Sequence, residues 1–194
     1  IDSGPNARTV RIDLEPFTLV GATTRLGNIS TPMRDRFGAI FRLDFYQKNE
    51  IFKILKRTAS ILEMNVQDDA LTEIAGRSRG TPRIANRVLK RVRDFAQVKN
   101  VKEISLEDAR SSLDSIGIDE NGLENMDRKI LKNLIVNYNG GPTGGKSLAI
   151  SINEDIQTIE DVYEPYLIKE GFIERTSRGR IATDKAYALF DLKK

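Results

Sequence analysis

The stretch MDRKILKNLIVNYNGGPTGGKSLAI, residues 126–150, decides how the last part of this chain folds, because its glycines fit two different structures. Gly140, Gly145, Lys146 and Ser147 satisfy the pattern G-x-x-x-x-G-K-[ST] of a phosphate-binding P-loop. In a P-loop a buried β-strand comes directly before the first glycine, and backbone N–H groups of the loop wrap the phosphates. The residues before Gly140 therefore distinguish a P-loop from a turn.

Those preceding residues have the pattern of an amphipathic helix. The apolar residues that would form its buried face are Met126, Ile130, Leu131, Leu134, Ile135 and Tyr138. Asn139 followed by two glycines predicts a left-handed helix end, and a second helix is expected to start near Ser147. The stretch therefore predicts a helix-turn-helix, and we expect its P-loop pattern to bind no phosphate.

The composition is typical of a globular protein that works inside the cell. With 194 residues, 39% of them hydrophobic, the chain is long enough for one or two domains with real cores. It has no Cys and no His, so neither disulfides nor the usual zinc ligands are available. No stretch predicts a membrane span or a signal peptide. We expect a cytoplasmic protein with no membrane partner and no metal ligands in this chain.

The net charge of +3 is small but unevenly distributed. Between residues 79 and 99 seven cationic side chains face one acid, Asp94, and the C-terminal end is basic again. Such local asymmetry indicates a polyanionic partner more clearly than the total charge does.

The first segment, to about Tyr46, predicts part of an α/β sheet. RTVRIDL (8–14), FTLVGATT (17–24) and AIFRLDF (39–45) have strand patterns, and a short helix around Pro32 separates the last two. These strands cannot complete a sheet, so we expect the chain to be the C-terminal part of a larger protein. Thr23 and Thr24 end a buried strand, where they either contact a ligand or cap the next turn.

The second segment, about Gln47 to Gly117, contains four helical patterns and predicts a compact bundle. Its third helix begins with Thr81, Pro82 and Arg83. A cation at a helix N-terminus is unfavourable by about 0.3–1 kcal/mol unless an anion shares the site. Arg83 therefore either binds phosphate or pairs with a nearby carboxylate.

The third segment follows the helix-turn-helix with a further helix and a β-hairpin. We expect that helix to be capped by Thr158 and interrupted at Pro165. The strands FIERT (172–176) and RIATD (180–184) then flank a tip rich in arginine: Arg175, Arg178 and Arg180. Arginine at a hairpin tip buries little, so these side chains favour phosphate contacts along DNA over a merely solvated hairpin.

Four stretches, in matching order and spacing, resemble the RuvB family, the motors that drive branch migration of Holliday junctions in bacteria. They are GATTRLGNISTPMRDRFG (21–38), RGTPRIANRVLKRVRDFA (79–96), the NGGP turn (139–142) and EPYLIKEGFIERTSRGR (164–180). The resemblance implies an α/β plus α fold. Residues 1–46 would be the C-terminal portion of a large AAA+ ATPase domain, 47–117 a helical small (lid) domain, and 118–194 a winged-helix DNA-binding domain.

The resemblance also implies a role for individual residues at the nucleotide. Thr24 resembles the sensor of the γ-phosphate, and Arg36 resembles the arginine finger that reaches the neighbouring subunit's nucleotide. Tyr46 resembles a contact to ATP in its own subunit, and Arg83 the second sensor. The two arginines would neutralise charge on the transferring phosphoryl group.

DNA and protein contacts are implied in the same way. Arg175 and Arg180 match DNA-contacting arginines of the family's winged-helix domain, with Arg178 at the hairpin tip between them. Some family members carry a further arginine at the position of Ile156, which leaves that contact open here. Family members form hexameric rings on duplex DNA with RuvA, and the RuvC resolvase is a further expected partner.

The start of the chain, residues 1–14, resembles the distal half of a different β-hairpin, the one through which family members bind RuvA. Ile1, Val10 and Ile12 are candidate apolar contacts, with ordinary strand packing as the alternative. The resemblance places the true P-loop and the acidic Mg²⁺ motif upstream of this chain, so ATP and Mg²⁺ are the expected cofactors of the intact protein. The chain by itself is expected to be inactive.

Two other functions fit parts of the sequence. A winged-helix regulator without catalysis would share the DNA-binding hairpin but would have no use for Arg36. A clamp-loader-like AAA+ protein would share the sensor residues but would not need the hairpin.

Overall fold

The computed structural model describes residues 13–193. The chain forms two compact units, one ending at Leu43 and the other beginning at Asp44. Ile1, Val10 and Ile12 lie outside the described residues.

The unit that ends at Leu43 contains two short helices. These are η1 (Leu26–Asn28), a single 3₁₀ turn, and α1 (Thr31–Arg34), which has Pro32 in its first turn as the sequence predicted. The strands expected at 17–24 and 39–45 are not formed, and residues 13–23 and 39–46 lie outside helices and strands. A strand needs a neighbour for its N–H and C=O groups, and the described residues supply none to these segments. Phe17, Val20 and Phe41 are accordingly exposed.

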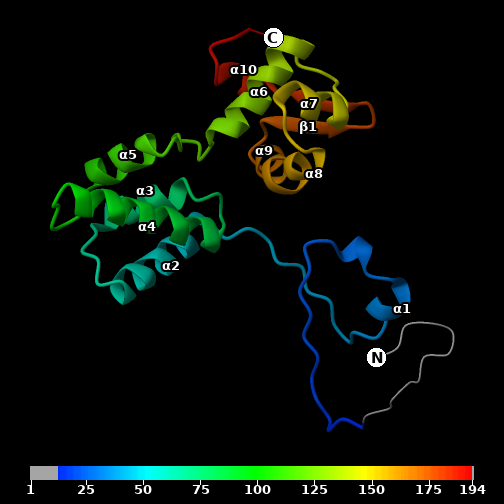
Figure 1. Cartoon of the computed structure of the whole chain (residues 1–194), viewed down its shortest axis with the longest axis horizontal. Helices are drawn as coiled ribbons and strands as arrows, with labels where there is room; N and C mark the ends of the chain where they lie inside the picture. The colour runs from blue at the N-terminus through cyan, green and yellow to red at the C-terminus, as the bar shows by residue number, and fades with distance from the viewer. Residues whose placement is uncertain (1–12, 194) are drawn as a thin grey trace. The chain divides into compact units, whose positions relative to one another are not determined.

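The predicted four-helix bundle is confirmed (Figure 1). Its helices are α2 (Lys48–Ile61), α3 (Asp68–Gly76), α4 (Pro82–Val98) and α5 (Leu106–Ser115). Their apolar faces share one core, in which Ile51, Leu55, Ile74 and Leu89 are fully buried. We call this bundle, with its connecting loops up to Ile118, the lid. Within residues 13–193 no helix combines the length and hydrophobicity needed to cross a membrane.

The predicted helix-turn-helix is also confirmed. It consists of α6 (Asn125–Tyr138) and α7 (Gly145–Ile152). Asn139 ends α6 in the left-handed conformation, with φ of +50°, as its position before two glycines predicted. These helices share a second core with the residues that follow them, and its fully buried members include Leu131, Leu134 and Leu148. We call residues 119–193 the head.

The third helix of the head runs from Ile156 to Lys169 in three pieces: α8 (Ile156–Thr158), η2 (Ile159–Tyr163) and α9 (Glu164–Lys169). The expectation that Thr158 caps it is wrong. Asp155 is the cap, and its carboxylate accepts the N–H groups of Gln157 at 2.8 Å and Thr158 at 3.0 Å. The interruption expected at Pro165 is present as the π-helical turn η2, which ends just before the proline. Proline lacks the N–H that a regular helix would need at this position.

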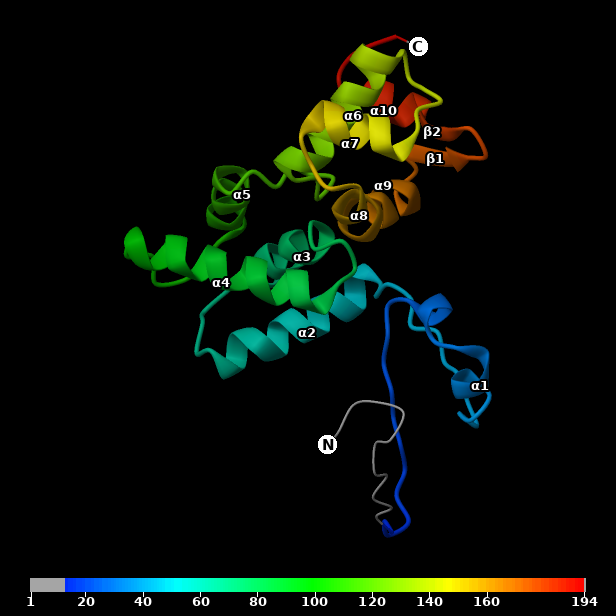
Figure 2. The same cartoon turned by 45° about the vertical axis from the view of Figure 1, so that its right-hand side comes forward.

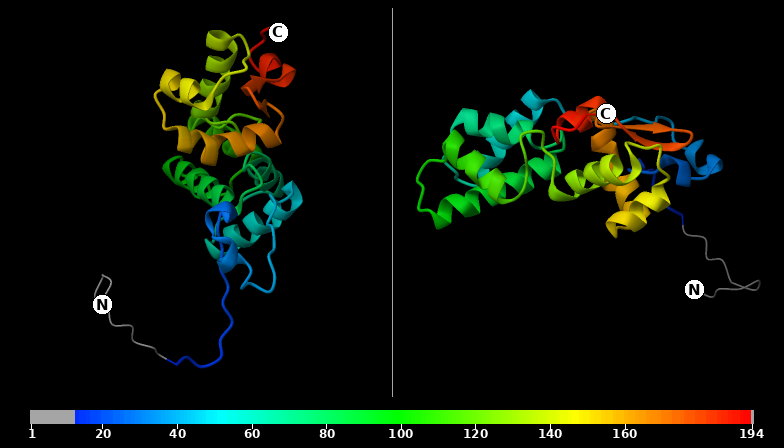
Figure 3. Two further views of the ribbon diagram at one scale, coloured as in Figure 1. Left: turned by 90° about the vertical axis from the view of Figure 1, so that its right-hand side faces the viewer. Right: turned by 90° about the horizontal axis from the view of Figure 1, so that it is seen from above.

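The predicted hairpin is formed by β1 (Ile173–Thr176) and β2 (Gly179–Ala182), which pair antiparallel (Figure 2). In this pairing Arg175 lies opposite Arg180. A short helix that the sequence analysis did not anticipate, α10 (Asp184–Ala188), follows β2. Thr183 caps it, since its hydroxyl accepts the N–H of Ala186 at 3.4 Å. The hairpin and the helices before it lie together in both views of Figure 3, and they form a winged-helix head.

Candidate functional site

In the Gly-rich turn, the backbone N–H groups of Gly140, Gly141 and Thr143 already have backbone acceptors. The N–H of Gly140 donates to Leu134 O at 2.9 Å, that of Gly141 to Tyr138 O at 2.8 Å, and that of Thr143 to Arg180 O at 3.0 Å. A Cβ on Gly141 would collide with the Arg180 carbonyl oxygen. Gly141 is therefore required by its packing against β2. A helix precedes this turn, so the prediction that no P-loop forms here is confirmed.

Two of the candidate nucleotide contacts meet in one loop of the lid. The N–H of Tyr46 donates to Gly80 O at 2.9 Å, and Gly80 is three residues before Arg83. Gly80 has φ of +66°, and a Cβ there would lie 2.7 Å from Tyr46 O, so only glycine permits this approach. Tyr46 and Arg83 are both exposed. The loop therefore presents an aromatic ring and a cation at the start of α4.

The surroundings of Arg83 fit an anion. Among the residues that the structure describes, none makes a hydrogen bond or ion pair with the Arg83 side chain. The alternative of a neighbouring carboxylate is thus not supported. The Thr81 side chain makes no capping hydrogen bond either, which leaves the first N–H groups of α4 without a side-chain partner. A helix start with uncapped N–H groups and an unpaired arginine matches phosphate in charge and geometry.

Thr24 and Arg36 lie in the unit that ends at Leu43. Thr24 is exposed on a bend before η1, and Arg36 is exposed directly after α1. The Arg36 guanidinium has no hydrogen bond or ion pair with any described residue. Both side chains are accessible, and the roles implied for them stay predictions.

The three hairpin arginines differ in their surroundings. Arg178 is exposed at the tip, and its guanidinium makes no ion pair within residues 13–193. The Arg175 side chain is 56% exposed and lies 3.2 Å from Glu160 and 3.8 Å from Glu164. The Arg180 side chain is only 7% exposed. The expectation that these arginines bury little is therefore wrong for Arg180.

Arg180 instead holds the hairpin to the helix before it. Its Nε donates to Glu164 at 2.5 Å and its Nη2 to Glu160 at 2.6 Å. Burial by itself lowers the pKa of Arg180, but the hydrogen bonds to these two carboxylates outweigh it and raise the pKa above its usual value. The available signal was the pair of glutamates four residues apart, which places both on one face of a helix.

Ile156 contributes apolar packing at the position where some family members carry arginine. It is half-buried and packs against the core of the head. Its Cδ1 lies 3.0 Å from the position that a Cβ on Gly145 would occupy. This position therefore provides no cation for DNA.

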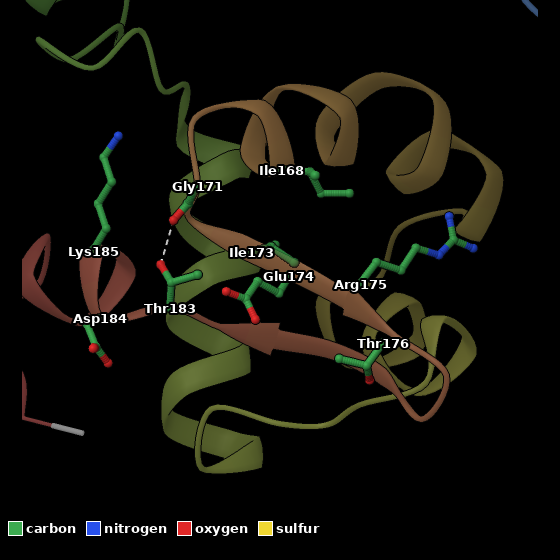
Figure 4. Close-up of a pocket in the computed structure, with 9 residues that line it drawn as sticks. All are labelled: Ile168, Gly171, Ile173, Glu174, Arg175, Thr176, Thr183, Asp184 and Lys185. Atoms are coloured by element: carbon green, nitrogen blue, oxygen red, sulfur yellow. Dashed lines mark hydrogen bonds between the residues drawn. The ribbon is translucent and has the colours of Figure 1, made fainter.

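A shallow groove of about 660 Å³ runs beside β1 (Figure 4). Its lining combines the acids Glu174 and Asp184 with the cations Arg175 and Lys185. The Lys185 ammonium donates to Glu170 O at 2.7 Å and lies 4.4 Å from the centre of the Phe172 ring. Mixed charge and an occupied lysine do not favour a polyanion in this groove, so the candidate DNA contacts are at the hairpin tip.

Two buried arginines that sequence reasoning missed precede the candidate sensor. Arg77 binds Glu73 at 2.7 Å, Asp114 at 3.0 Å and the carbonyl oxygen of Ile118 at 3.0 Å. These contacts fix the loop between α3 and α4 to α5 and to the residues that follow it. Burial alone would raise the pKa of Glu73, but hydrogen bonds from Arg77 and Arg110 lower it below its ordinary value.

Arg79 joins the lid to the head. Its Nε donates to Gly122 O at 2.9 Å, and its Nη2 forms a very short ion pair with Asp127, which is fully buried. Burial raises the pKa of Asp127, and the charge of Arg79 opposes this shift. The Arg79 guanidinium lies 4.8 Å from the centre of the Tyr166 ring. A run of basic residues gave no sign that Arg79 would be buried, because its partners are distant in the sequence.

Models of three RuvB domains match the chain in succession. The Holliday junction DNA helicase RuvB P-loop domain matches residues 1–43, the RuvB AAA lid domain 46–119, and the RuvB C-terminal winged helix domain 120–191.

Individual relatives agree with these matches. The chain is 56% identical over 192 residues to the Holliday junction branch migration complex subunit RuvB of Oleidesulfovibrio alaskensis. This match covers 99% of this chain and 60% of that relative. It is 51% identical over 190 residues to the subunit of the same name from Fusobacterium nucleatum, covering 98% of this chain and 57% of the relative. The structure of the Thermotoga maritima RuvB Holliday junction branch migration motor superposes with a TM-score of 0.87 at 49% identity, covering 92% of this chain and 60% of that one. The chain thus spans about 60% of the length of its relatives.

Proposed function

Since the chain belongs to the RuvB family of AAA+ ATPases, we propose that it is part of a cytoplasmic motor that uses ATP to drive branch migration of Holliday junctions. In this proposal the full-length protein forms a hexameric ring on duplex DNA and works with RuvA, and its product junctions are passed to RuvC. The observation that carries the proposal is the presence, in one compact unit, of an unpaired arginine at a helix start and an exposed arginine at a hairpin tip.

The lid residues act at the nucleotide. Hydrolysis of ATP would supply the free energy of the motor, and Arg83 and the first N–H groups of α4 would hold phosphate oxygens of the nucleotide. Tyr46, fixed to Gly80 by its backbone N–H, packs against the nucleotide of its own subunit. Residues 13–193 contain no group of three acidic side chains placed to share a metal ion, so no Mg²⁺ ligand is assigned within them.

Residues of the first unit act on the chemistry of hydrolysis. Thr24 contacts the γ-phosphate through its hydroxyl. Arg36 extends to the nucleotide of the neighbouring subunit and neutralises the charge that develops on the transferring phosphoryl group. Delivery from a neighbour makes hydrolysis depend on how the subunits are arranged.

The hairpin acts on DNA through phosphate contacts. Arg178 at the tip and Arg175 at its edge are exposed and bind the backbone without reading sequence. A direct contact from Arg180 would require it to give up two ion pairs at 2.5 and 2.6 Å. We therefore assign Arg180 to holding the hairpin in place.

Branch migration of a synthetic Holliday junction tests the proposal. The full-length protein that contains this sequence, with RuvA and ATP, should convert the junction to duplex products, and Arg36→Ala should abolish the conversion. Lys146→Ala is the matched control, since it changes the misleading P-loop pattern only. Junction binding without any ATP-dependent conversion by the wild type would favour the winged-helix regulator instead.

A further inference from the structure

A continuous series of contacts joins the residues expected to bind nucleotide to the hairpin expected to bind DNA. We propose that Arg79 is a positioning residue that couples nucleotide binding at Tyr46 and Arg83 to the placement of the DNA-binding hairpin. The proposal rests on the function proposed above, because it needs a ligand at each end.

The nucleotide end of this connection is the backbone around Gly80. Arg79 is covalently joined to Gly80, whose carbonyl oxygen accepts the Tyr46 N–H at 2.9 Å. Two residues further on, α4 begins and presents Arg83. A movement of Tyr46 or Arg83 toward a bound phosphate is therefore passed directly to the backbone of Arg79.

The Arg79 side chain carries this movement into the head. Its guanidinium binds Gly122 O and the Asp127 carboxylate, and Asp127 also accepts the Glu124 N–H at 2.7 Å in the first turn of α6. Removing one partner of a buried ion pair costs about 3–5 kcal/mol, because the other charge is left uncompensated. This pair therefore keeps its partners together when the loop moves.

From Arg79 the contacts continue along α9 to the hairpin. The guanidinium stacks on Tyr166, whose hydroxyl donates to Asn121 O at 2.7 Å. A tyrosine hydroxyl is protonated at neutral pH, and burial raises the pKa of Tyr166 further, to about 12. Tyr166 is two residues from Glu164, which binds Arg180 of β2.

A second contact joins α9 to the nucleotide end. The Lys169 ammonium lies 4.6 Å from the centre of the ring of Phe45, the residue before Tyr46. On the lid side, Arg77 fixes the same loop to α5. The loop is thus bound on both sides, and it has little freedom to absorb a displacement instead of transmitting it.

A purely structural role is the alternative, and the two roles predict different measurements. A pair that only stabilises the lid–head contact affects unfolding and leaves the influence of nucleotide on DNA affinity unchanged. Replacing a coupling residue changes the effect of nucleotide on DNA affinity. It changes the effect of DNA on nucleotide affinity by the same factor, because linkage between two sites is reciprocal.

The test uses Asp127→Asn in the full-length protein, because asparagine retains an oxygen for the Glu124 N–H and removes the charge. Duplex affinity is measured with and without a non-hydrolysable ATP analogue, and analogue affinity with and without duplex. We expect the wild type to show coupling of about fivefold or more, and the variant less than about twofold, with each separate affinity retained. Arg87→Gln is the control, because Arg87 pairs with Glu124 at 3.0 Å across the same contact but is exposed.

Each outcome decides between the roles. Equal coupling in Asp127→Asn and wild type overturns the proposal and leaves the pair structural. If Asp127→Asn does not fold, Arg79→Lys replaces it in the same affinity measurements, and hydrogen exchange of the wild type is measured with and without nucleotide. If nucleotide does not change the protection of residues 122–128, the proposal is overturned. A wild type that binds either ligand poorly contradicts the proposed function, whereas one that binds both without coupling contradicts this inference alone.

Discussion

Arg178 and Arg180 are two positions apart on one hairpin, yet their surroundings give them different roles. Arg178 has no ion pair among the described residues and is exposed, so nothing in the fold requires it. Arg180 is buried against Glu164, a carboxylate whose side chain is only 2% exposed. Removing a charge from such a pair leaves its partner in an environment of low polarity, which destabilises the fold.

We predict that Arg180→Ala lowers the stability of the head by about 3–5 kcal/mol, while Arg178→Ala changes it by less than about 0.5 kcal/mol. On duplex DNA, Arg178→Ala should flatten the slope of log K against log salt by about 0.9, the contribution of one phosphate contact. Thermal unfolding and a salt series of duplex binding measure the two effects. An unchanged salt slope for folded Arg178→Ala would move the DNA contact away from the tip.

Glu73 gives the lid a dependence on pH. Its pKa is lowered in the folded state, so the carboxylate stabilises the fold fully above the unfolded value near 4.5, and this contribution is lost as pH falls through the folded value. Glu73→Gln should therefore be less stable than wild type at pH 7, and the difference should shrink below about pH 4. Urea unfolding at several pH values measures this, with the exposed Glu120→Gln as control. A difference independent of pH would mean that the ion pair with Arg77 is not its source.

The individual helices show which features of the fold a sequence reveals. The four lid helices and the helix-turn-helix follow from apolar spacing, because burial of one face dominates their stability. The cap at Asp155 and the π-helical turn before Pro165 depend on competing local hydrogen bonds, and the spacing of apolar residues does not report these. The buried state of Arg79 and Arg180 depends on carboxylates that the fold brings from other helices. The strands expected at 17–24 and 39–45 have no neighbours to pair with among the described residues.

The Gly-rich turn yields a prediction about an element that resembles a P-loop in sequence only. Lys146→Ala should change the ATP affinity of the full-length protein by less than about twofold, since a P-loop requires a strand-delivered set of free N–H groups. Arg83→Ala, measured by the same titration with a fluorescent ATP analogue, should weaken binding clearly more. A large loss of affinity in Lys146→Ala would contradict the assignment of α6 and α7 to the head.

In the ring that we propose, Arg36 acts on the nucleotide of the neighbouring subunit, so its role involves two subunits. We predict that Arg36→Ala leaves ATP binding largely intact and lowers hydrolysis by about 10³-fold or more, the effect typical of arginine fingers. Mixing this variant with one disabled in the P-loop of the full-length protein should restore part of the activity, because some interfaces then combine an intact arginine with an intact P-loop. No recovery between two folded, ring-forming variants would place the action of Arg36 within its own subunit.

In our proposal, the lid contacts nucleotide, the hairpin contacts DNA and Arg79 connects the two, so that DNA and ATP affect each other's binding. The measurement that tests this most directly is the steady-state ATPase rate of the full-length protein with and without circular duplex DNA and RuvA. We predict that duplex DNA raises the rate in the wild type, and that Arg178→Ala keeps the basal rate but loses much of the increase. An ATPase rate that is the same with and without duplex, in a wild type that binds both ligands, would contradict the account.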